Sequence, residues 1–572
     1  MTDALISVAG LGKRFDGGTV EALSDLSFEI GTGAITGLVG PDGAGKTTLL
    51  RLLAGLLDRD EGAMRVCGLD PRSDAAPLHA QLSYMPQKFG LYEDLTVLEN
   101  LDLYADLREV SGPERAERFE TLLAFTTLGP FTGRLAGALS GGMKQKLGLA
   151  CALIRKPRLL LLDEPSVGVD PISRRELWRM VQDLVDDGIG VIWSTAYLDE
   201  AEMCGRVLVL SEGRMIFDGP PGGMTAPLAG RAFRLTGLET GRRRILGDLL
   251  TRADVVDGVI EGADIRLILR PGSEPGALSE GLTGARMVPV APRFEDAFMD
   301  RLGGVGKQRS PFRNGARAER MPGKSVIRSD RLTRKFGDFV AASEISFNVT
   351  EGEIYGLIGP NGAGKSTTFK MLCGLLKPTS GSATIAGFDL GQSPSKARGR
   401  LGYMAQKFSL YGDLSVRQNL EFFAGVYGLS GAGRATAIGQ MIDTFELGEL
   451  LSQDAGSVPP GHKQRLALAC AVMHHPDVLF LDEPTSGVDP RTRREFWTHI
   501  NALSDSGTTI IVTTHFMEEA EYCDRVGLVY AGNMIAEGSP AALKARAGDP
   551  DITLEGAFIH LVETSQNGGV AP

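Results

Sequence analysis

The chain is poor in the features that mark disulfide-bonded, zinc-binding and nucleic-acid-binding proteins. Its six cysteines contain no C-x-x-C pair, so we expect small buried core residues of a protein in a reducing compartment, not disulfides or metal ligands. Acidic residues outnumber basic ones, 71 against 60, and the formal net charge is −11. Because a nucleic-acid-binding surface is basic, this balance argues against a general nucleic-acid binder.

Long hydrophobic segments are also missing. The N-terminus, MTDALISVAG, has no basic segment followed by a long apolar run, and no stretch approaches the roughly 18 apolar residues that a membrane-spanning helix needs. The most apolar region, 147–162, is interrupted by Arg155, Lys156 and Arg158. We therefore expect a cytoplasmic protein that meets the inner face of the cell membrane only peripherally, through an integral partner.

What the chain does contain is one long internal repeat. Lys46 and Asp163 have counterparts in Lys365 and Asp482, an offset of 319 residues in both cases (365 − 46 and 482 − 163). About 200 residues, beginning at Ala22, align at this offset without a gap. Each copy is long enough to bury a core of its own, so the repeat predicts two similar domains.

The two copies lose their register after Gly219. The first copy has 59 more residues than the second before FEDAF at 294–298 aligns with LEGAF at 554–558 (319 − 260). Apolar runs in this extra segment predict strands and short helices, in the order strand 232–235, helix 243–250, strands 255–260 and 265–269, helix 277–282 and strand 286–290. This order predicts a small α+β domain of the βαββαβ type.

Two glycine-rich segments lie at equivalent places in the copies. GPDGAGKT at 40–47 and GPNGAGKS at 359–366 each follow a short apolar strand and precede a helical run. A phosphate-binding loop requires this context, because glycines let backbone N–H groups converge on phosphates at a helix N-terminus, while the lysine reaches the β- and γ-phosphates. The hydroxyl after the lysine ligates Mg²⁺ in such loops, so Thr47 and Ser366 are candidate metal ligands.

Each copy also has an apolar strand that ends in two acids. LLLLDE ends in Asp163 and Glu164, and VLFLDE ends in Asp482 and Glu483. A buried parallel strand delivers its C-terminal carboxylates to the edge of the sheet where nucleotides bind. The aspartates therefore suit the Mg²⁺ shell, and the glutamates suit polarisation of an attacking water.

These motifs, in this order, resemble the ATP-binding cassette (ABC) ATPases over about 440 of the 572 residues. The resemblance extends to the further motifs of that family: glutamine loops at Gln87 and Gln406, an LSGG signature at 139–142, D-loops at 166–170 and 486–489, and a switch histidine at His515. It implies an α/β fold with two P-loop NTPase domains, each with mixed sheets and helices. It also implies that the two cassettes pair head to tail, with ATP between one phosphate loop and the other cassette's signature.

By this resemblance the chain binds ATP and Mg²⁺ and hydrolyses ATP. The residues expected to contact ATP are Phe15 and Phe336 on adenine, the loop residues Gly40, Pro41, Asp42, Gly43, Ala44, Gly45, Lys46, Thr47, Thr48, Gly359, Pro360, Asn361, Gly362, Ala363, Gly364, Lys365, Ser366 and Thr367, then Gln87 and Gln406, and the signature Ser140, Gly141 and Gly142. The expected catalytic residues are Glu483, His515, Gln406, Lys365 and Glu164, and the expected metal ligands are Thr47, Asp163, Ser366 and Asp482. Filling of an aromatic core is the alternative role for Phe15 and Phe336.

The copies differ where their chemistry is most sensitive. The second copy reads VPPG at 458–461 in place of LSGG, and Ala196 stands where the second copy has His515. Proline at position 459 removes a hydroxyl, and proline at 460 removes a backbone N–H. If the cassettes pair head to tail, both defects fall in the composite site of Lys46, so we expect one degenerate and one hydrolysis-competent site.

The segments after the glutamine loops, QKFGLYEDLTVLENL and QKFSLYGDLSVRQNL, resemble the membrane-coupling segments of exporter ATPases. The resemblance implies an energy-coupling subunit of a drug or lipophile exporter that binds two integral-membrane permease subunits, with a periplasmic adaptor as a further partner. Two alternatives stay open: a soluble tandem ABC ATPase that acts on ribosomes, and the tandem ATPase of a sugar importer. The loss of one signature argues against the ribosomal ATPase, and the exporter-like coupling segments argue against the sugar importer.

These observations divide the chain into five expected segments. They are an N-terminal ATPase domain at 1–222, an α+β insert at 223–302, a basic flexible linker at 303–324, a C-terminal ATPase domain at 325–563 and a disordered tail at 564–572. The linker is rich in glycine, arginine and proline, as a solvated tether would be. Binding to an anionic membrane surface is its alternative role.

Overall fold

A computed structural model describes residues 4–87, 90–238, 241–304, 310–314, 323–406, 410–514, 516–548 and 552–567. The chain forms two compact units. Unit 1 consists of Met1–Ala229 and Pro292–Arg301, and unit 2 consists of Gly230–Ala291 and Leu302–Pro572. Of the segment predicted as an insert, residues 230–291 group with the second cassette, whereas 223–229 and 292–301 group with the first.

Unit 1 is built on a six-stranded sheet whose central strands are buried on both faces and whose edge strand Arg214–Gly219 is partly exposed. The order is β5 (Leu82–Met85), β6 (Leu159–Asp163), β7 (Gly190–Thr195), β3 (Ile35–Val39), β8 (Arg206–Ser211) and β9 (Arg214–Gly219). All neighbours pair in parallel except β8 and β9. Strands covered on both faces need to be apolar throughout, which explains the run LLLLD in β6.

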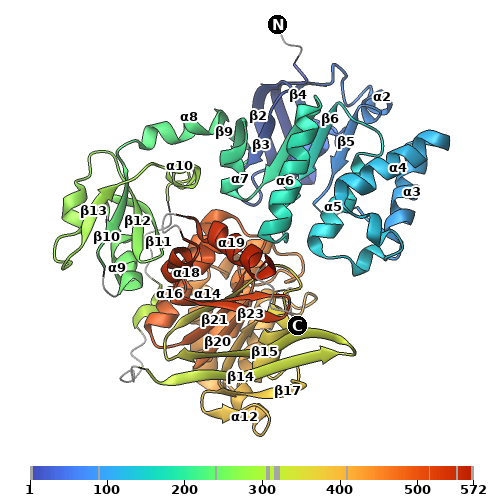
Figure 1. The fold of residues 1–572 in the computed structure, drawn as a ribbon. Helices are drawn as coiled ribbons and strands as arrows, with labels where there is room; N and C mark the ends of the chain where they lie inside the picture. Colours follow the sequence, from blue (N-terminus) through green and yellow to red (C-terminus); the bar gives the residue numbers. More distant parts are fainter. Residues whose placement is uncertain are drawn as a thin grey trace. The chain divides into compact units, whose positions relative to one another are not determined.

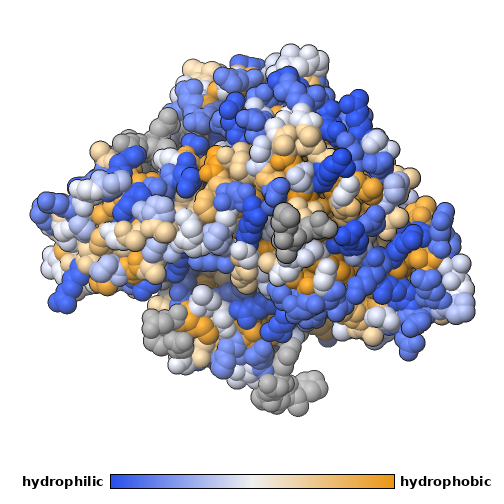
Figure 2. Space-filling view, turned by 90° about the horizontal axis from the view of Figure 1, so that it is seen from above, coloured by the Kyte–Doolittle hydropathy of each residue, from blue (hydrophilic) through white to orange (hydrophobic). Residues whose placement is uncertain are grey.

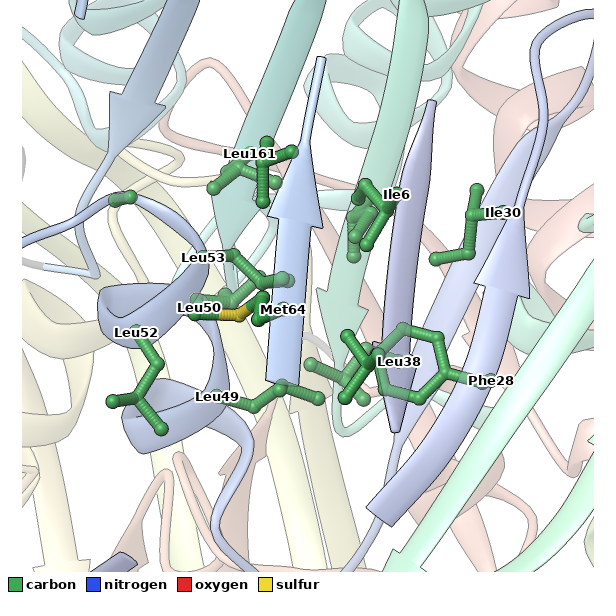
Figure 3. Packing of buried hydrophobic residues seen from close by; sticks show 14 of the residues in the cluster. Ile6, Phe28, Ile30, Leu38, Leu49, Leu50, Leu52, Leu53, Met64 and Leu161 are labelled. Carbon is green, nitrogen blue, oxygen red and sulfur yellow. The ribbon is translucent and has the colours of Figure 1, made fainter. Parts of the chain in front are cut away.

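A second, antiparallel sheet of unit 1 has the order β2 (Val20–Ile30), β1 (Ile6–Phe15), β4 (Glu61–Val66). Leu49, Leu50 and Leu53 of the first helix are buried between this sheet and the six-stranded sheet, and Figure 3 shows them beside Met64 of β4 and Leu161 of β6. This core fixes the helix that follows the phosphate loop. The helices of unit 1 are α1 (Lys46–Leu53), α2 (Ala75–His79), α3 (Val97–Leu107), α4 (Gly112–Thr126), α5 (Gly141–Ala152), α6 (Pro171–Asp186), α7 (Leu198–Met203), α8 (Pro221–Thr225) and α10 (Phe294–Arg301).

The cassette of unit 2 repeats this architecture. Its six-stranded sheet has the order β19 (Leu401–Met404), β20 (Val478–Asp482), β21 (Thr509–Thr514), β16 (Ile354–Ile358), β22 (Arg525–Tyr530), β23 (Asn533–Gly538), and its antiparallel sheet has the order β15 (Phe339–Thr350), β14 (Ser325–Phe336), β17 (Ser380–Ile385), β18 (Phe388–Asp389). The helices are α11 (Lys365–Leu372), α12 (Pro394–Arg398), α13 (Val416–Val426), α14 (Gly431–Thr444), α15 (Pro460–Val472), α16 (Pro490–Asp505), α17 (Met517–Ala520), α18 (Pro540–Arg546) and α19 (Leu554–Asn567). The matching order of strands shows that the sequence repeat is a repeat of structure.

The insert is a four-stranded antiparallel sheet with the order β11 (Val255–Glu261), β12 (Asp264–Leu269), β10 (Ala232–Thr236), β13 (Arg286–Pro289). Helix α9 (Arg242–Leu249) confirms the first predicted helix, whereas the second helical run is only a 3₁₀ turn, Pro275–Leu278. A proline and a glycine begin that turn, and neither favours a longer helix. Helix α9 lies beside α16 (Figure 1).

Charged side chains attach the insert to the second cassette within unit 2. Arg243 of α9 donates to Ser504 Oγ at 2.9 Å and forms an ion pair with Asp524. At the other end of α16, the side chain of Arg494 lies 3.4 Å from that of Asp257, which is 2 % exposed. Burial of an unpaired carboxylate costs free energy, so the pairing of Asp257 with Arg494 favours the observed position of the insert on the cassette.

Parts of the expected linker and tail have defined structure. Within the linker, Pro311–Asn314 forms a 3₁₀ turn, and the ring of Phe312 packs against Phe445 and His499 at centroid distances of 6.0 Å. Residues 305–309 and 315–322 lie outside the described residues. Helix α19 continues to Asn567, into the segment expected to be a tail. The hydroxyl of Thr564 donates to the carbonyl of His560 there, as in a regular helix.

No helix among the described residues is both long and apolar enough to cross a membrane. The face of the molecule in Figure 2 is a mosaic in which hydrophobic residues occur in small groups among hydrophilic ones. The expectation that any membrane contact needs a partner stays a prediction.

Candidate nucleotide-binding sites

Both glycine-rich segments form a closed loop between a strand and a helix. In unit 1 the loop at 40–45 connects β3 to α1, and Lys46 Nζ donates to the carbonyl oxygens of Gly40 at 2.7 Å and Pro41 at 3.2 Å. In unit 2 the loop at 359–364 connects β16 to α11, with the same contacts from Lys365 at 2.6 and 2.9 Å. The lysine side chain is therefore folded back along its own loop, within reach of a phosphate bound there.

One glycine in each loop is required by the backbone. Gly45 and Gly364 cap the helices with φ of 100° and 101°, in the left-handed region that favours glycine. A Cβ at Gly364 would lie 2.2 Å from the carbonyl oxygen of Ala341, and one at Gly45 would lie 2.7 Å from that of Ala22. Any larger residue would thus push the loop away from the neighbouring antiparallel sheet, at β2 in unit 1 and β15 in unit 2.

The predicted metal ligands of unit 1 lie together. The hydroxyl of Thr47 donates to Asp163 Oδ1 at 3.2 Å, and Tyr84 OH donates to Asp163 Oδ2 at 3.1 Å. Burial raises the pKa of the Asp163 carboxyl, and these two hydrogen bonds partly offset the effect. In unit 2 the hydroxyl of Thr513 donates to Asp482 instead, and burial raises the pKa of this carboxyl too. Carboxylate and hydroxyl oxygens at a strand end form a donor set that fits Mg²⁺.

The two glutamates that follow sit beside the phosphate loop and the glutamine loop. Gln87 Nε2 donates to Glu164 Oε2 at 2.9 Å, and Gln406 Nε2 donates to Glu483 Oε2 at 2.7 Å. Lys46 Nζ lies 3.5 Å from Glu164 Oε1. Each cassette therefore brings its loop lysine, glutamine and acid pair to one place, as the sequence predicts.

Both glutamates have an unusual backbone. Glu164 has φ of 50° and Glu483 has φ of 49°, in a region that non-glycine residues rarely occupy. Glu483 N donates to the carbonyl and to the hydroxyl of Thr513, at 3.0 and 3.1 Å, which holds this conformation. A strained backbone conformation costs free energy and persists only where the surrounding structure holds it in place. Such conformations are concentrated at functional sites. Twelve other non-glycine residues among those described also have positive φ, so the conformation supports a functional role here only together with the motif.

The signature helices of the two cassettes begin differently. Helix α5 begins after Ser140, whose hydroxyl accepts a hydrogen bond from Met143 N at 3.3 Å. Gly142 is buried, and a Cβ there would lie 2.6 Å from Ser173 Oγ. Helix α15 begins after Pro459, which provides no side-chain cap. The start of α5 thus presents N–H groups and a hydroxyl, whereas prolines occupy the same places in α15.

The switch position and the adenine position give further comparisons. Ala196 is 8 % exposed at the end of β7, and His515 lies outside the described residues. Phe336 is 49 % exposed at the end of β14, with the guanidinium of Arg334 over its ring at 4.6 Å. Phe15 is partly buried, with Lys13 Nζ 5.4 Å from its ring centre. An exposed ring favours stacking over core filling at Phe336, and both adenine contacts stay predictions.

The sequence interpretation missed several residues that hold the site. Tyr84, Thr513 and two buried glutamates, Glu200 and Glu519, are the clearest cases. Glu200 Oε2 accepts hydrogen bonds from Ser166 Oγ, Trp193 Nε1 and Thr195 Oγ1, at 2.9, 2.8 and 2.6 Å. Recurrence of glutamate at the 319 offset could have singled out Glu200 and Glu519, but no motif identifies their partners.

Glu200 gives a prediction for the pH dependence of stability. Burial raises its pKa to about 7, although Arg174 lowers it and Asp199 raises it further. Between the unfolded value of 4.5 and about 7 the folded state binds more protons than the unfolded state, so stability falls as pH rises through this window.

Glu200→Gln should remove this pH dependence of stability. The amide oxygen of the glutamine still accepts hydrogen bonds from Ser166, Trp193 and Thr195. We expect the variant to gain up to about 3 kcal/mol relative to the original protein between pH 5 and pH 8. The measurement is denaturant unfolding of both proteins at the two pH values. If the difference in free energy of unfolding between the two proteins were the same at pH 5 and pH 8, Glu200 would not titrate in this range.

Known proteins place these sites in a family. The family model described as "ABC transporter" matches residues 23–167 and 342–486, which contain both phosphate loops and both acid pairs. The chain belongs to the ABC transporter family. It is 57 % identical over 570 residues to the probable multidrug ABC transporter ATP-binding protein YbhF of Escherichia coli, with 98 % of each chain covered. ABC cassettes hydrolyse ATP, and the resemblance stated from the motifs is confirmed.

Shorter relatives match a single cassette. The Nod factor export ATP-binding protein I of Burkholderia orbicola is 42 % identical over 213 residues, which is 37 % of this chain and 70 % of that protein. A solved ATP-binding subunit of an ABC transporter is 28 % identical and covers 41 % of this chain and 99 % of its own, with a TM-score of 0.40. The similarity to YbhF, in contrast, extends over 98 % of this chain and 98 % of that protein.

Proposed function

We propose that this ABC protein is the energy-coupling ATPase of an exporter of drugs or other lipophilic molecules. Support comes from the relatives whose names specify multidrug transport and Nod factor export. Support also comes from the two segments that follow the glutamine loops, which begin at Gln87 and Gln406. In both cassettes these segments lead into a helix with a capping box, α3 after Thr96 and α13 after Ser415, which gives a partner a rigid element to bind.

We further propose that ATP turnover is confined to one composite site. The single observation that carries this is the contrast between the helix starts at Ser140 and Pro459. With head-to-tail pairing, the N–H groups and hydroxyl at the start of α5 complete the site of the second cassette, where a helix N-terminus and its donors stabilise the γ-phosphate. The competent site then consists of Lys365, Ser366, Gln406, Asp482, Glu483, His515, Ser140, Gly141 and Gly142.

At this site each described side chain has a definite task. Lys365 holds the β- and γ-phosphates from within its loop, and Mg²⁺ on Asp482 and Ser366 would neutralise phosphate charge. Glu483 accepts a hydrogen bond from the side-chain amide of Gln406 and is proposed to polarise the attacking water. His515, which lies outside the described residues, is assigned to the γ-phosphate by its place in the sequence.

The other composite site is proposed to bind ATP but to turn it over slowly. Lys46, Thr47, Asp163 and Glu164 have the arrangement of a nucleotide site, yet Ala196 offers no side-chain donor, and Pro459 has no hydroxyl. Loss of one preorganised donor typically costs about 10²- to 10³-fold in rate. We therefore assign this site to holding the closed dimer of cassettes.

The proposal predicts conditional membrane association. The partners are two integral-membrane permease subunits, with a periplasmic adaptor as a further component. When co-expressed with its permease, the chain should sediment with membranes, and when expressed alone it should stay in the supernatant, because no described helix can span a bilayer. Quantitative immunoblotting of both fractions is the measurement. Co-sedimentation with ribosomes in place of membranes would favour the ribosomal alternative and contradict the exporter function.

A further inference from the structure

A buried glutamate of the second cassette has no part in the chemistry described so far. Glu519 of α17 is 1 % exposed. Its carboxylate accepts hydrogen bonds from the hydroxyl of Thr485 and, at 2.6 Å, from Thr514 Oγ1, and Arg493 Nε lies 3.8 Å from it. Burial of a carboxylate is unfavourable unless donors surround it. The surrounding donors therefore account for its position.

The partners of Glu519 lie next to the residues that carry the proposed reaction. Thr485 lies two residues after Glu483, in the segment between β20 and α16. Thr514 ends β21 and directly precedes position 515, and its hydroxyl accepts a hydrogen bond from Phe516 N at 2.9 Å. The contacts of Glu519 thus reach the backbone on both sides of position 515 and the segment just beyond Glu483.

The backbone also determines the direction of one of these hydrogen bonds. Thr514 Oγ1 accepts from the N–H of Phe516, so its own proton is donated to Glu519. A chain of hydrogen bonds with one possible direction has less freedom than a single contact, and its members strengthen one another in a dry interior.

The first cassette contains the same arrangement at the same offset. Glu200 contacts Ser166 and Thr195 (519 − 200, 485 − 166 and 514 − 195 are all 319), and Thr195 Oγ1 accepts from Tyr197 N at 2.9 Å. There the position between Thr195 and Tyr197 is Ala196, which has no group to orient. The arrangement belongs to both folds, and only in the second cassette does it adjoin a histidine, at position 515, in place of Ala196.

We propose that Glu519 is a positioning residue for ATP hydrolysis. By binding Thr485 and Thr514 together, it holds the segment just beyond Glu483 against the end of β21 and so keeps Glu483 where the reaction requires it. The proposal rests on the proposed function of the second cassette and adds a residue to it. Misplacement of a reacting group by about 1 Å can cost on the order of 10²-fold in rate, so loss of one hydrogen bond in this arrangement should be measurable.

The test uses ATPase kinetics of the full chain. Glu519→Gln and Thr485→Val should each lower kcat about 10-fold and change the KM for ATP by less than about 2-fold. The double variant should be no slower than the slower single variant, because both substitutions disturb the one hydrogen-bonded arrangement around Glu519. Thr485→Ser, which keeps the hydroxyl, should retain kcat. A merely structural role would not give this rescue together with a selective loss of kcat.

Two variants serve as matched controls. Glu521→Gln alters a buried glutamate of the same region that pairs with Lys544, and Thr498→Val removes a hydroxyl of α16 that donates to the carbonyl of Arg494; both should keep kcat. An unchanged kcat in Glu519→Gln, or additive losses in the double variant, would overturn the proposal. Glu483→Gln and Glu164→Gln in the same series test the proposed function separately, because equal losses there would refute the asymmetry whatever Glu519 does.

Discussion

Glu483→Gln should lower the ATPase rate of this protein by about 10²-fold or more, whereas Glu164→Gln should lower it by less than about 3-fold. Both glutamates have the same left-handed backbone and the same contact with a glutamine amide. The expected difference therefore does not arise from the glutamates. It arises from what completes each site, Ser140 in one case and Pro459 in the other.

The measurement is a matched series on purified protein with its permease, with rates normalised to folded protein. The substitution is isosteric and the positions are equivalent, so each variant is the control for the other. His515→Ala should behave like Glu483→Gln. Similar losses from Glu164→Gln and Glu483→Gln would show that both sites turn over, and the asymmetry would then be wrong.

Gly141→Asp, although it lies in the first cassette, should remove turnover at the site of the second by about 10²-fold or more. Gly141 is the first residue of α5, and a carboxylate there would face the γ-phosphate of the proposed composite site. An acid in the first turn of a helix is favourable to the helix itself. We therefore expect the thermal stability of the variant to equal or exceed that of the original protein.

Loss of activity without loss of stability is the diagnostic result for Gly141→Asp. Gly142 is less suitable, because a Cβ there would lie 2.6 Å from Ser173 Oγ and would disturb unit 1 directly. The control is Pro460→Asp, the change at the equivalent position of the second signature (141 + 319), which should alter the rate little because that signature is already defective. If Pro460→Asp were the more harmful of the two, the cassettes would not divide the work as proposed.

Most of the candidate site could be predicted from the sequence. The loops that hold Lys46 and Lys365, and the strands that end in Asp163 and Asp482, were recognised because each motif is a contiguous segment whose local pattern specifies its structure. The insert was predicted from its alternating strands, and only its second helix was overestimated. The composite site and the domain boundaries stay predictions.

The sequence by itself determined that this protein has two ABC cassettes, that both can bind a nucleotide, and that their signatures differ. Only the tertiary structure decided which side chains hold the acids in place, such as Tyr84 on Asp163, and that Glu519 connects Thr485 with Thr514. It also grouped the insert with the second cassette, through Arg243 and Asp257. The reason is that periodicity assigns a residue to a face of its element, whereas the partner it meets depends on how distant elements pack.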